Sequence, residues 1–176
     1  MKNYGKGLFV GRFQPLHKGH LDVIEKISRQ CDEIVIVIGS ANRQKECKNP
    51  LSYEERKTIL ESVLKKSNIN YNIEMINDIP DDDEWMKELL KIDFDAIYSS
   101  NPWVLELAKR WNSQDYSYDI IGAKSSVRSK KNNYISSTMI RNKIADQDDD
   151  WRALVPLEVA DMIDSRFKRR IKQLCP

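Results

Sequence analysis

Cysteine is scarce in this sequence, at three of 176 residues. Their odd number argues against a disulfide framework for Cys31, Cys47 and Cys175. Their positions also lack the spacing of metal ligands, which argues against a structural metal site. Long apolar runs are missing as well: no stretch is long enough to span a bilayer, and no signal-peptide apolar region follows the N-terminus. We therefore expect a cytoplasmic protein with no membrane partner.

An excess of charge of one sign is also absent. The 29 basic and 27 acidic side chains give a formal net charge of only +2, too little for the electrostatic field that dominates nucleic-acid binding. Two local basic runs remain, at residues 124–131 and 166–172. The first suits a loop that closes over a nucleotide, and in the second the charges alternate with apolar residues at helical spacing. We expect no nucleic-acid partner.

Length and composition predict one compact domain over residues 1–176, because a hydrophobic content of 40% suffices for a sizeable core. Short β-rich runs alternate with helical periodicity, which is the pattern of a parallel sheet covered by helices on both faces. The expected strands are residues 7–11, 34–38, 71–76, 96–99 and 119–122. The fold class is therefore α/β, with a Rossmann-like doubly wound sheet and a C-terminal helical segment.

Local signals mark where several helices begin. Ser52 and Glu55 have the spacing of a capping box, and Asn101 stands as an N-cap before a proline at the first helical position. Either Ser136 or Ser137 is expected to cap a later helix. Because ligands bind at the carboxyl ends of strands in a doubly wound sheet, Asn101, which follows a strand, is also a candidate ligand contact.

The most informative segment, residues 11–20, reads Gly-Arg-Phe-Gln-Pro-Leu-His-Lys-Gly-His and joins an apolar strand to an amphipathic helix. Gly19 removes a side chain where the backbone would approach a phosphate, and the free N–H groups of the helix start add partial positive charge. His17 and His20 are three residues apart, so both can face one ligand, and Arg12 adds a fork-shaped cation. The turn therefore predicts a site for nucleotide phosphates.

This segment resembles the His-x-Gly-His nucleotidyltransferase superfamily, and its opening, residues 11–15, is similar to that of the nicotinamide-mononucleotide adenylyltransferase branch. Residues 135–141, Ile-Ser-Ser-Thr-Met-Ile-Arg, resemble the second phosphate-binding signature of that family. Residues 150–156 resemble the segment that follows in archaeal-type members, so the resemblance covers nearly the whole chain. It implies transfer of AMP from ATP to nicotinamide mononucleotide (NMN), with NAD and pyrophosphate as products.

The resemblance also bears on cofactors and assembly. Archaeal-type relatives form homo-oligomers, often hexamers, so association of this chain is implied by the resemblance alone. Mg²⁺ is expected to arrive bound to ATP, because this ion in nucleotide sites is usually held by substrate phosphates and water. The acidic cluster at residues 146–150 is interpreted as a solvated turn, and no metal ligands are assigned within the protein.

Neither motif contains a carboxylate placed to act as a general base. A phosphate monoester needs none, because its second pKa of about 6 leaves it largely dianionic at neutral pH. The expected reaction is direct in-line attack of the acceptor phosphate on the α-phosphorus of ATP, without a covalent intermediate. In this interpretation His20 donates to the α-phosphate, His17 and Arg141 hold the outgoing phosphates, and Arg12 bridges the substrates. The ATP site is completed by Gly11, Phe13, Gln14, Gly19, Asn101, Ser136, Ser137 and Thr138.

Fewer residues identify the acceptor. In the nicotinamide branch a tryptophan at the place of Trp85 stacks on the pyridine ring, and an electron-rich face suits a cationic pyridinium; the alternative is a core anchor for a short helix. Asp82 is a candidate acceptor for the carboxamide N–H. Lys48 is a candidate for the acceptor phosphate, where family members often carry arginine. Ser40 and Ile79 complete the expected NMN site.

Other functions stay open at this point. One is a related cytidylyl- or adenylyltransferase with another phosphomonoester acceptor such as phosphopantetheine, which the opening at residues 11–15 and Arg141 disfavour. Another is a module that senses NAD or ATP without turnover, against which the completeness of both motifs argues. A fragment of a class I aminoacyl-tRNA synthetase would need an anticodon-reading region that 176 residues do not contain.

Overall fold

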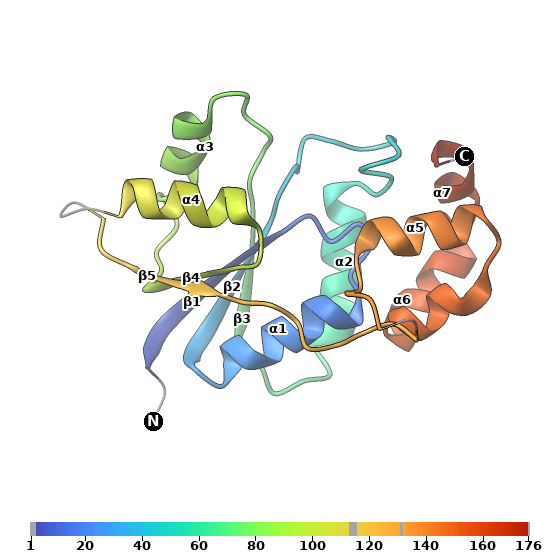
Figure 1. Ribbon diagram of the computed structural model, residues 1–176, viewed down its shortest axis with the longest axis horizontal. Coiled ribbons are helices and arrows are strands. Elements are labelled where there is room, and N and C mark those ends of the chain that lie inside the picture. Colours follow the sequence, from blue (N-terminus) through green and yellow to red (C-terminus); the bar gives the residue numbers. More distant parts are fainter. Residues whose placement is uncertain (1–2, 113–115, 131, 176) are drawn as a thin grey trace. The chain divides into compact units, whose positions relative to one another are not determined.

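The computed structural model describes residues 3–112, 116–130 and 132–175, and the chain folds into two compact units (Figure 1). The first comprises Met1–Gly11, Val23–Ser40 and Ile69–Lys124, and the second Arg12–Asp22, Ala41–Asn68 and Ser125–Pro176. The single domain expected over residues 1–176 stays a prediction. Lys131, the last residue of the first basic run, lies outside the described residues.

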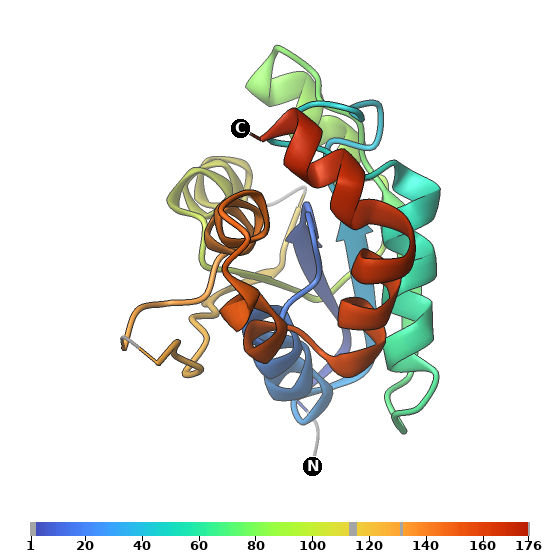
Figure 2. The ribbon, with the colours of Figure 1, turned by 90° about the vertical axis from the view of Figure 1, so that its right-hand side faces the viewer.

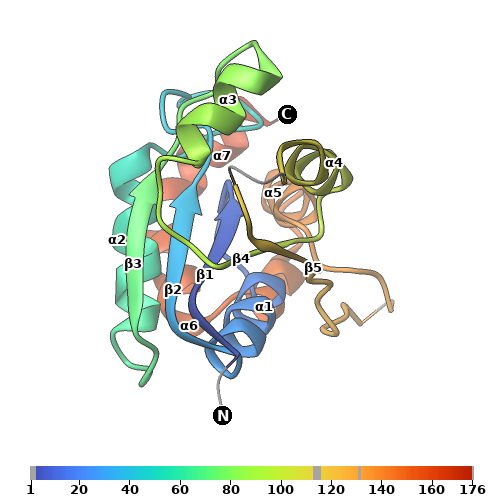
Figure 3. The ribbon, with the colours of Figure 1, turned by 90° about the vertical axis from the view of Figure 1, so that its left-hand side faces the viewer.

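A five-stranded parallel sheet forms the centre of the first unit (Figure 3). The strands are β1 (Tyr4–Gly11), β2 (Cys31–Ile38), β3 (Tyr71–Met75), β4 (Ala96–Ser99) and β5 (Asp119–Gly122). Their order is β3-β2-β1-β4-β5, so the chain starts at the centre, moves outward to β3 and returns to the other side of β1. The expected α/β doubly wound sheet is confirmed, and β1 and β2 begin three residues earlier than the sequence predicts.

Both faces of this sheet are apolar, as a parallel sheet covered on both faces requires. On one face, α3 (Asp82–Leu89) and α4 (Pro102–Trp111) lie side by side (Figure 1). They enclose a cluster of buried residues that includes Leu8, Val35, Val37 and Ile97 of the strands and Trp85, Met86, Leu89, Val104, Leu107 and Ala108 of the helices. Because side chains alternate along a strand, Gly7 faces the opposite side, where Ile27 of α1 (Lys18–Ser28) packs against it.

The second unit is helical. It contains α2 (Tyr53–Leu64), α5 (Ser137–Ala145), a 3₁₀ turn η1 (Asp149–Leu154), α6 (Leu157–Met162), a π-helical turn η2 (Ile163–Phe167) and α7 (Lys168–Leu174). Helix α5 packs against η1 and α7, and α2 packs against α6. Figure 2 shows the red path from α6 to α7 beside α2, which confirms the expected C-terminal helical segment. No helix among the described residues is both long and apolar enough to cross a membrane.

The helix starts follow the signals in the sequence. Ser52 and Glu55 form the expected capping box at α2, with reciprocal hydrogen bonds of 3.2 Å and 2.9 Å between side chain and backbone N–H. Asn101 caps α4 through its side-chain oxygen, which accepts from the backbone N–H of Trp103 at 3.1 Å. Ser136, rather than the adjacent serine, caps α5.

We predict that Gly7→Ala destabilises the first unit. An added Cβ would lie 2.5 Å from Cys31 Sγ and 2.8 Å from Ile27 Cγ2, so the packed face of the sheet would have to shift. Overpacking of this kind costs about 1–3 kcal/mol, which a lower urea midpoint would report. Gly122→Ala is the matched control, because no atom lies within 4 Å of a Cβ added there. Equal midpoints for the two variants would contradict the packing argument.

Candidate functional site

The segment after β1 is a tight turn, residues 12–17, which belongs to the second unit. Phe13 lies there in the left-handed backbone region with a φ of 50°, although it carries a side chain. Such a conformation costs roughly 1–3 kcal/mol and persists only where the surrounding structure determines it. Phe13 is buried, and the hydrogen bonds that hold its neighbours come from α2, the segment before α2, and α5 of the same unit.

Two residues of the second motif hold the backbone of this turn. Arg141 donates through Nη1 to the carbonyl oxygen of Gln14 at 2.8 Å. One residue further along the turn, the carbonyl of Pro15 accepts from the Ser137 hydroxyl at 3.0 Å. The two motifs, which are some 120 residues apart in sequence, therefore form one hydrogen-bonded structure.

The start of α2 holds the same turn from another direction. Arg56 donates through Nη1 to the carbonyl of Arg12 at 2.9 Å. The Gln14 amide makes two hydrogen bonds with the backbone of Leu51, donating to its carbonyl at 2.8 Å and accepting from its N–H at 3.0 Å. Neither Arg56 nor Leu51 is among the site residues predicted from the sequence. A usable signal was present, because Arg56 precedes Ile59 by three residues and so lies on the buried stripe of its helix.

The two histidines stack on each other at the start of α1. Their ring centroids are 3.6 Å apart with an angle of 19° between the planes, and the Phe13 ring lies 4.8 Å from that of His20. The backbone N–H of each histidine points to Nδ1 of the other, at 3.3 Å for His20 Nδ1 and 3.2 Å for His17 Nδ1. An Nδ1 that accepts a hydrogen bond carries no proton, so the neutral rings carry theirs on Nε2.

Both rings are neutral at physiological pH. Burial lowers the pKa of His17 from 6.5 to about 4. Burial, and secondarily the neighbouring His17, holds the pKa of His20 well below its usual value. The pair therefore offers Nε2–H donors to a ligand without adding positive charge.

Gly19 has a packing role that the sequence did not predict. A Cβ at this position would lie 3.0 Å from Nδ1 and 3.1 Å from Cε1 of His17. Glycine thus allows the His17 ring to lie against the first turn of α1. Its expected role in letting a phosphate approach stays a prediction.

Arg141 is a buried cation without an anionic partner among the residues that the structure describes. Its guanidinium is 4% exposed and, besides the Gln14 carbonyl, donates through Nη2 to the Thr138 hydroxyl at 3.2 Å. Its Nε–H has no hydrogen-bond partner there, and no described carboxylate forms an ion pair with it. A buried charge is costly unless it is compensated, so this group favours the binding of an anion.

Two further predicted phosphate contacts are exposed residues of the second unit. Arg12 follows β1 directly, and none of the described carboxylates forms an ion pair with its guanidinium. Lys48 lies in the segment that precedes α2 and is likewise exposed. Both side chains are therefore accessible to an anion in solvent.

The remaining acceptor residues lie in the first unit. Trp85 is 5% exposed and belongs to the apolar cluster under α3 and α4, with its ring 4.8 Å from that of Trp103. Asp82 accepts from the indole N–H of Trp103 at 3.3 Å, and Ile79 packs against the same cluster. This burial fits the core-anchor alternative for Trp85, and stacking on a pyridine ring stays a prediction.

Three other predicted residues lie at, or just after, the carboxyl ends of strands in the first unit. Gly11 ends β1, and its carbonyl accepts from Gly39 N–H at 2.9 Å. Ser40 follows β2 with a φ of 51° and donates to the Asp78 carboxylate at 2.7 Å. Asn101 follows β4, where its cap role is confirmed and its contact with ATP stays a prediction.

Comparisons with known proteins agree with the two motifs. The profile of the family described as cytidylyltransferase-like matches residues 8–143. A protein of Methanococcus vannielii named nicotinamide-nucleotide adenylyltransferase is 38% identical over 160 residues, which cover 90% of this chain and 87% of the relative. A protein of Methanococcus aeolicus with the same name is 36% identical over 172 residues, which cover 96% and 94%.

The fold also occurs among solved structures. A bifunctional NMN adenylyltransferase/ADP ribose pyrophosphatase from Francisella tularensis superposes with a TM-score of 0.71 at 23% sequence identity. The match covers 97% of this chain and 53% of that chain, so this chain spans about half the length of the bifunctional protein. This similarity confirms the fold expected from the sequence.

We predict that His17 makes the protein less stable as the pH falls. Between pH 6.5 and about 4 the unfolded chain protonates this histidine while the folded protein does not, so the free energy of unfolding decreases as pH falls through that window. The full difference in pKa corresponds to about 3 kcal/mol, of which about 2 kcal/mol is lost between pH 7.5 and pH 5.0. Urea titrations at pH 7.5 and 5.0 would measure it, with His17→Asn as the control because it lacks the titrating group. An equal loss in both proteins would contradict the low pKa.

Proposed function

This chain belongs to the cytidylyltransferase-like family, and from that membership and the geometry of its second unit we propose that it transfers AMP from ATP to NMN, forming NAD and pyrophosphate. The family resemblance that the two motifs indicated is thereby confirmed. The observation that carries the proposal is a pair of neutral, stacked histidines beside a turn that accepts a hydrogen bond from Arg141. Arg141 is buried and forms no ion pair with a carboxylate of the described residues. Such a set of donors suits a polyphosphate.

In the proposed reaction an oxygen of the NMN phosphate forms a bond to the α-phosphorus of ATP. The bond from that phosphorus to the bridging oxygen of the β-phosphate breaks, and pyrophosphate leaves with the electron pair. No proton has to be removed from the acceptor at neutral pH. The enzyme therefore has to align the two phosphates and stabilise charge in the transition state.

We assign separate roles to the histidines and to the arginines of the site. His20 donates its Nε2–H to the α-phosphate oxygens, while His17 and Arg141 bind the departing phosphates. Because both imidazoles are neutral, the positive charge comes from Arg141, from the exposed Arg12 and from the metal that accompanies ATP. We assign Mg²⁺ to that role as part of the substrate, since this ion prefers phosphate and water oxygens. A homo-oligomeric state and a cytoplasmic location belong to the same proposal.

A pyrophosphate-release assay tests the proposed function. The purified protein would be given ATP or CTP together with NMN, nicotinic acid mononucleotide or phosphopantetheine. We expect ATP to be used more efficiently than CTP, and NMN more efficiently than phosphopantetheine. His20→Ala should lower kcat by about 10²-fold with a smaller effect on the KM for ATP, because its donor acts mainly in the transition state. If no acceptor led to release of pyrophosphate, the proposed enzymatic activity would be refuted. A preference for phosphopantetheine would refute the assignment of NMN as the acceptor.

Trp85 tests the acceptor separately, and its burial calls for variants that keep the core filled. Trp85→Phe and Trp85→Leu both place an apolar side chain under α3 and α4, but only phenylalanine keeps an aromatic face. Stacking on the pyridinium is worth ~1–2 kcal/mol, so Trp85→Leu should raise the KM for NMN about tenfold relative to Trp85→Phe. Thermal melts and the KM for ATP should be similar in the two variants. Equal KM values for NMN would make Trp85 a core anchor only.

A further inference from the structure

Arg56 is a fully buried cation whose position the apolar packing of its helix does not explain. Its side chain is 0% exposed, whereas its partners on the buried stripe of α2 are Ile59, Leu60 and Leu64. Burying a guanidinium costs several kcal/mol unless hydrogen bonds compensate it, and an apolar side chain of similar size is often equally stable in such a place. The residue is thus a poor choice for packing alone.

Two hydrogen bonds of Arg56 connect the first turn of α2 to the turn at residues 12–17. Its Nε donates to the Ser52 carbonyl at 3.1 Å, which fixes the guanidinium against the first turn of α2. Its Nη1 donates to the Arg12 carbonyl at 2.9 Å. The planar fork of arginine reaches both oxygens at once, which the single ammonium of lysine does less well.

The Arg12 carbonyl belongs to the peptide unit that precedes the strained residue of the turn. Phe13, at a φ of 50°, begins with the N–H of that peptide, so fixing the carbonyl restricts the rotation that would relieve the strain. The Phe13 ring in turn lies 4.8 Å from the ring of His20, which stacks on His17. A continuous series of contacts therefore joins Arg56 to both histidines.

We propose that Arg56 is a positioning residue that sets the orientation of the histidine pair through the Arg12 carbonyl and Phe13. It touches no substrate itself, and its effect on catalysis rests on the proposed adenylyl transfer. Phe13 is followed by Gln14, whose amide forms paired hydrogen bonds with Leu51. Helix α2 and the segment before it therefore hold the turn on both sides of Phe13. Replacing Arg56 removes the hydrogen bond to the Arg12 carbonyl and leaves the one at Gln14.

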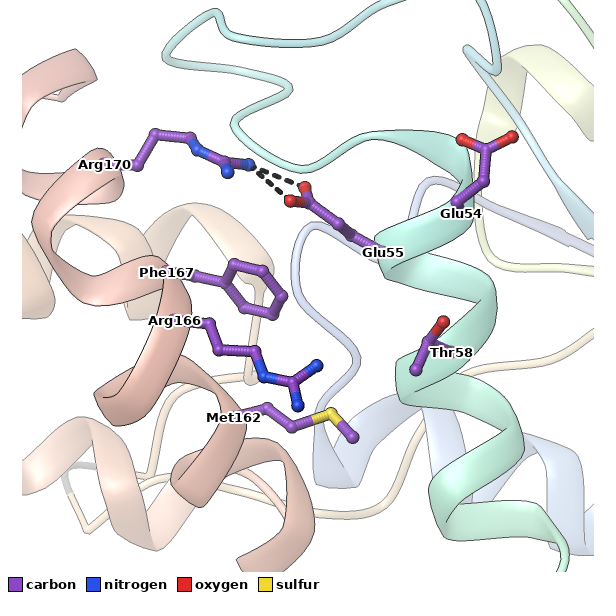
Figure 4. Close-up of a pocket in the computed structure, with 7 residues that line it drawn as sticks. All are labelled: Glu54, Glu55, Thr58, Met162, Arg166, Phe167 and Arg170. Carbon is purple, nitrogen blue, oxygen red and sulfur yellow. Dashed lines mark hydrogen bonds and ion pairs between the residues drawn. The ribbon is translucent and has the colours of Figure 1, made fainter.

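The test compares Arg56→Met with a control at the same end of α2. Arg170 of α7 forms a bidentate ion pair with Glu55, at 2.6 Å and 2.8 Å, on the rim of a 320 Å³ cavity lined by Met162 and Phe167 (Figure 4). It also donates to the Pro50 carbonyl but to no residue of the turn. Arg170→Met therefore removes a partly buried guanidinium from this end of α2 while both hydrogen bonds of Arg56, to Ser52 and to Arg12, stay in place.

Arg56→Met should lower kcat at least about tenfold per folded molecule with little change in the KM for ATP, because small displacements of catalytic groups have effects of this size. Arg170→Met should leave kcat within about twofold of the wild type, since Arg170 makes none of the hydrogen bonds that join Arg56 to the turn. Arg56→Lys, which keeps a cationic donor group but loses the planar fork, should have an intermediate kcat and serves as the second variant if the methionine protein does not fold.

A readout independent of turnover separates this proposal from the proposed function. The chain contains only two histidines, so their imidazole ¹⁵N signals report the pair without ambiguity. Arg56→Met or Arg56→Lys should shift the Nδ1 and Nε2 signals of His20, and Arg170→Met should not. Unchanged signals together with a kcat that follows only the folded fraction would make Arg56 merely structural. Absence of pyrophosphate release in the wild type would instead refute the proposed function, while the ¹⁵N signals would still decide the positioning role.

Discussion

The candidate site depends on hydrogen bonds to the backbone carbonyls of the turn at residues 12–15. This turn contains a residue in the left-handed region and does not hold its shape by internal bonds alone. Its carbonyls at positions 12, 14 and 15 accept from Arg56, Arg141 and Ser137 respectively, and the Gln14 side chain bonds to the segment before α2. Because the histidines follow this turn directly, its conformation determines where their Nε2–H donors lie.

The second motif has two functions in this account. Ser137 and Arg141 were expected to bind phosphate, and both also hold the backbone of the first motif. The backbone conformation of the first motif therefore depends on side chains of the second. The buried Arg141 has no carboxylate partner among the described residues, which leaves its charge available to a phosphate. The histidines add donors that are neutral, so the proposed polyphosphate site combines two chemically different kinds of group.

The sequence predicted what local patterns determine. The β-branched run at residues 34–38 and the capping box at Ser52 identified a central strand and a helix start correctly, because each signal acts over a few neighbouring residues. Long-range partners were not predictable in this way. The link from Arg56 to the Arg12 carbonyl joins positions 44 residues apart, and only its place on a buried stripe marked it out. The burial of Trp85 similarly depends on α3 packing against α4.

In the proposed mechanism the histidines act as hydrogen-bond donors, and AMP passes directly from ATP to the acceptor phosphate. A rival mechanism would use an imidazole nitrogen as a nucleophile and form an adenylylated histidine in a first step. The two are distinguished by the configuration at phosphorus when the α-phosphate of ATP is a single thiophosphate diastereomer. One in-line displacement predicts NAD with inverted configuration at that phosphorus. Retention, which requires two displacements, would contradict the account.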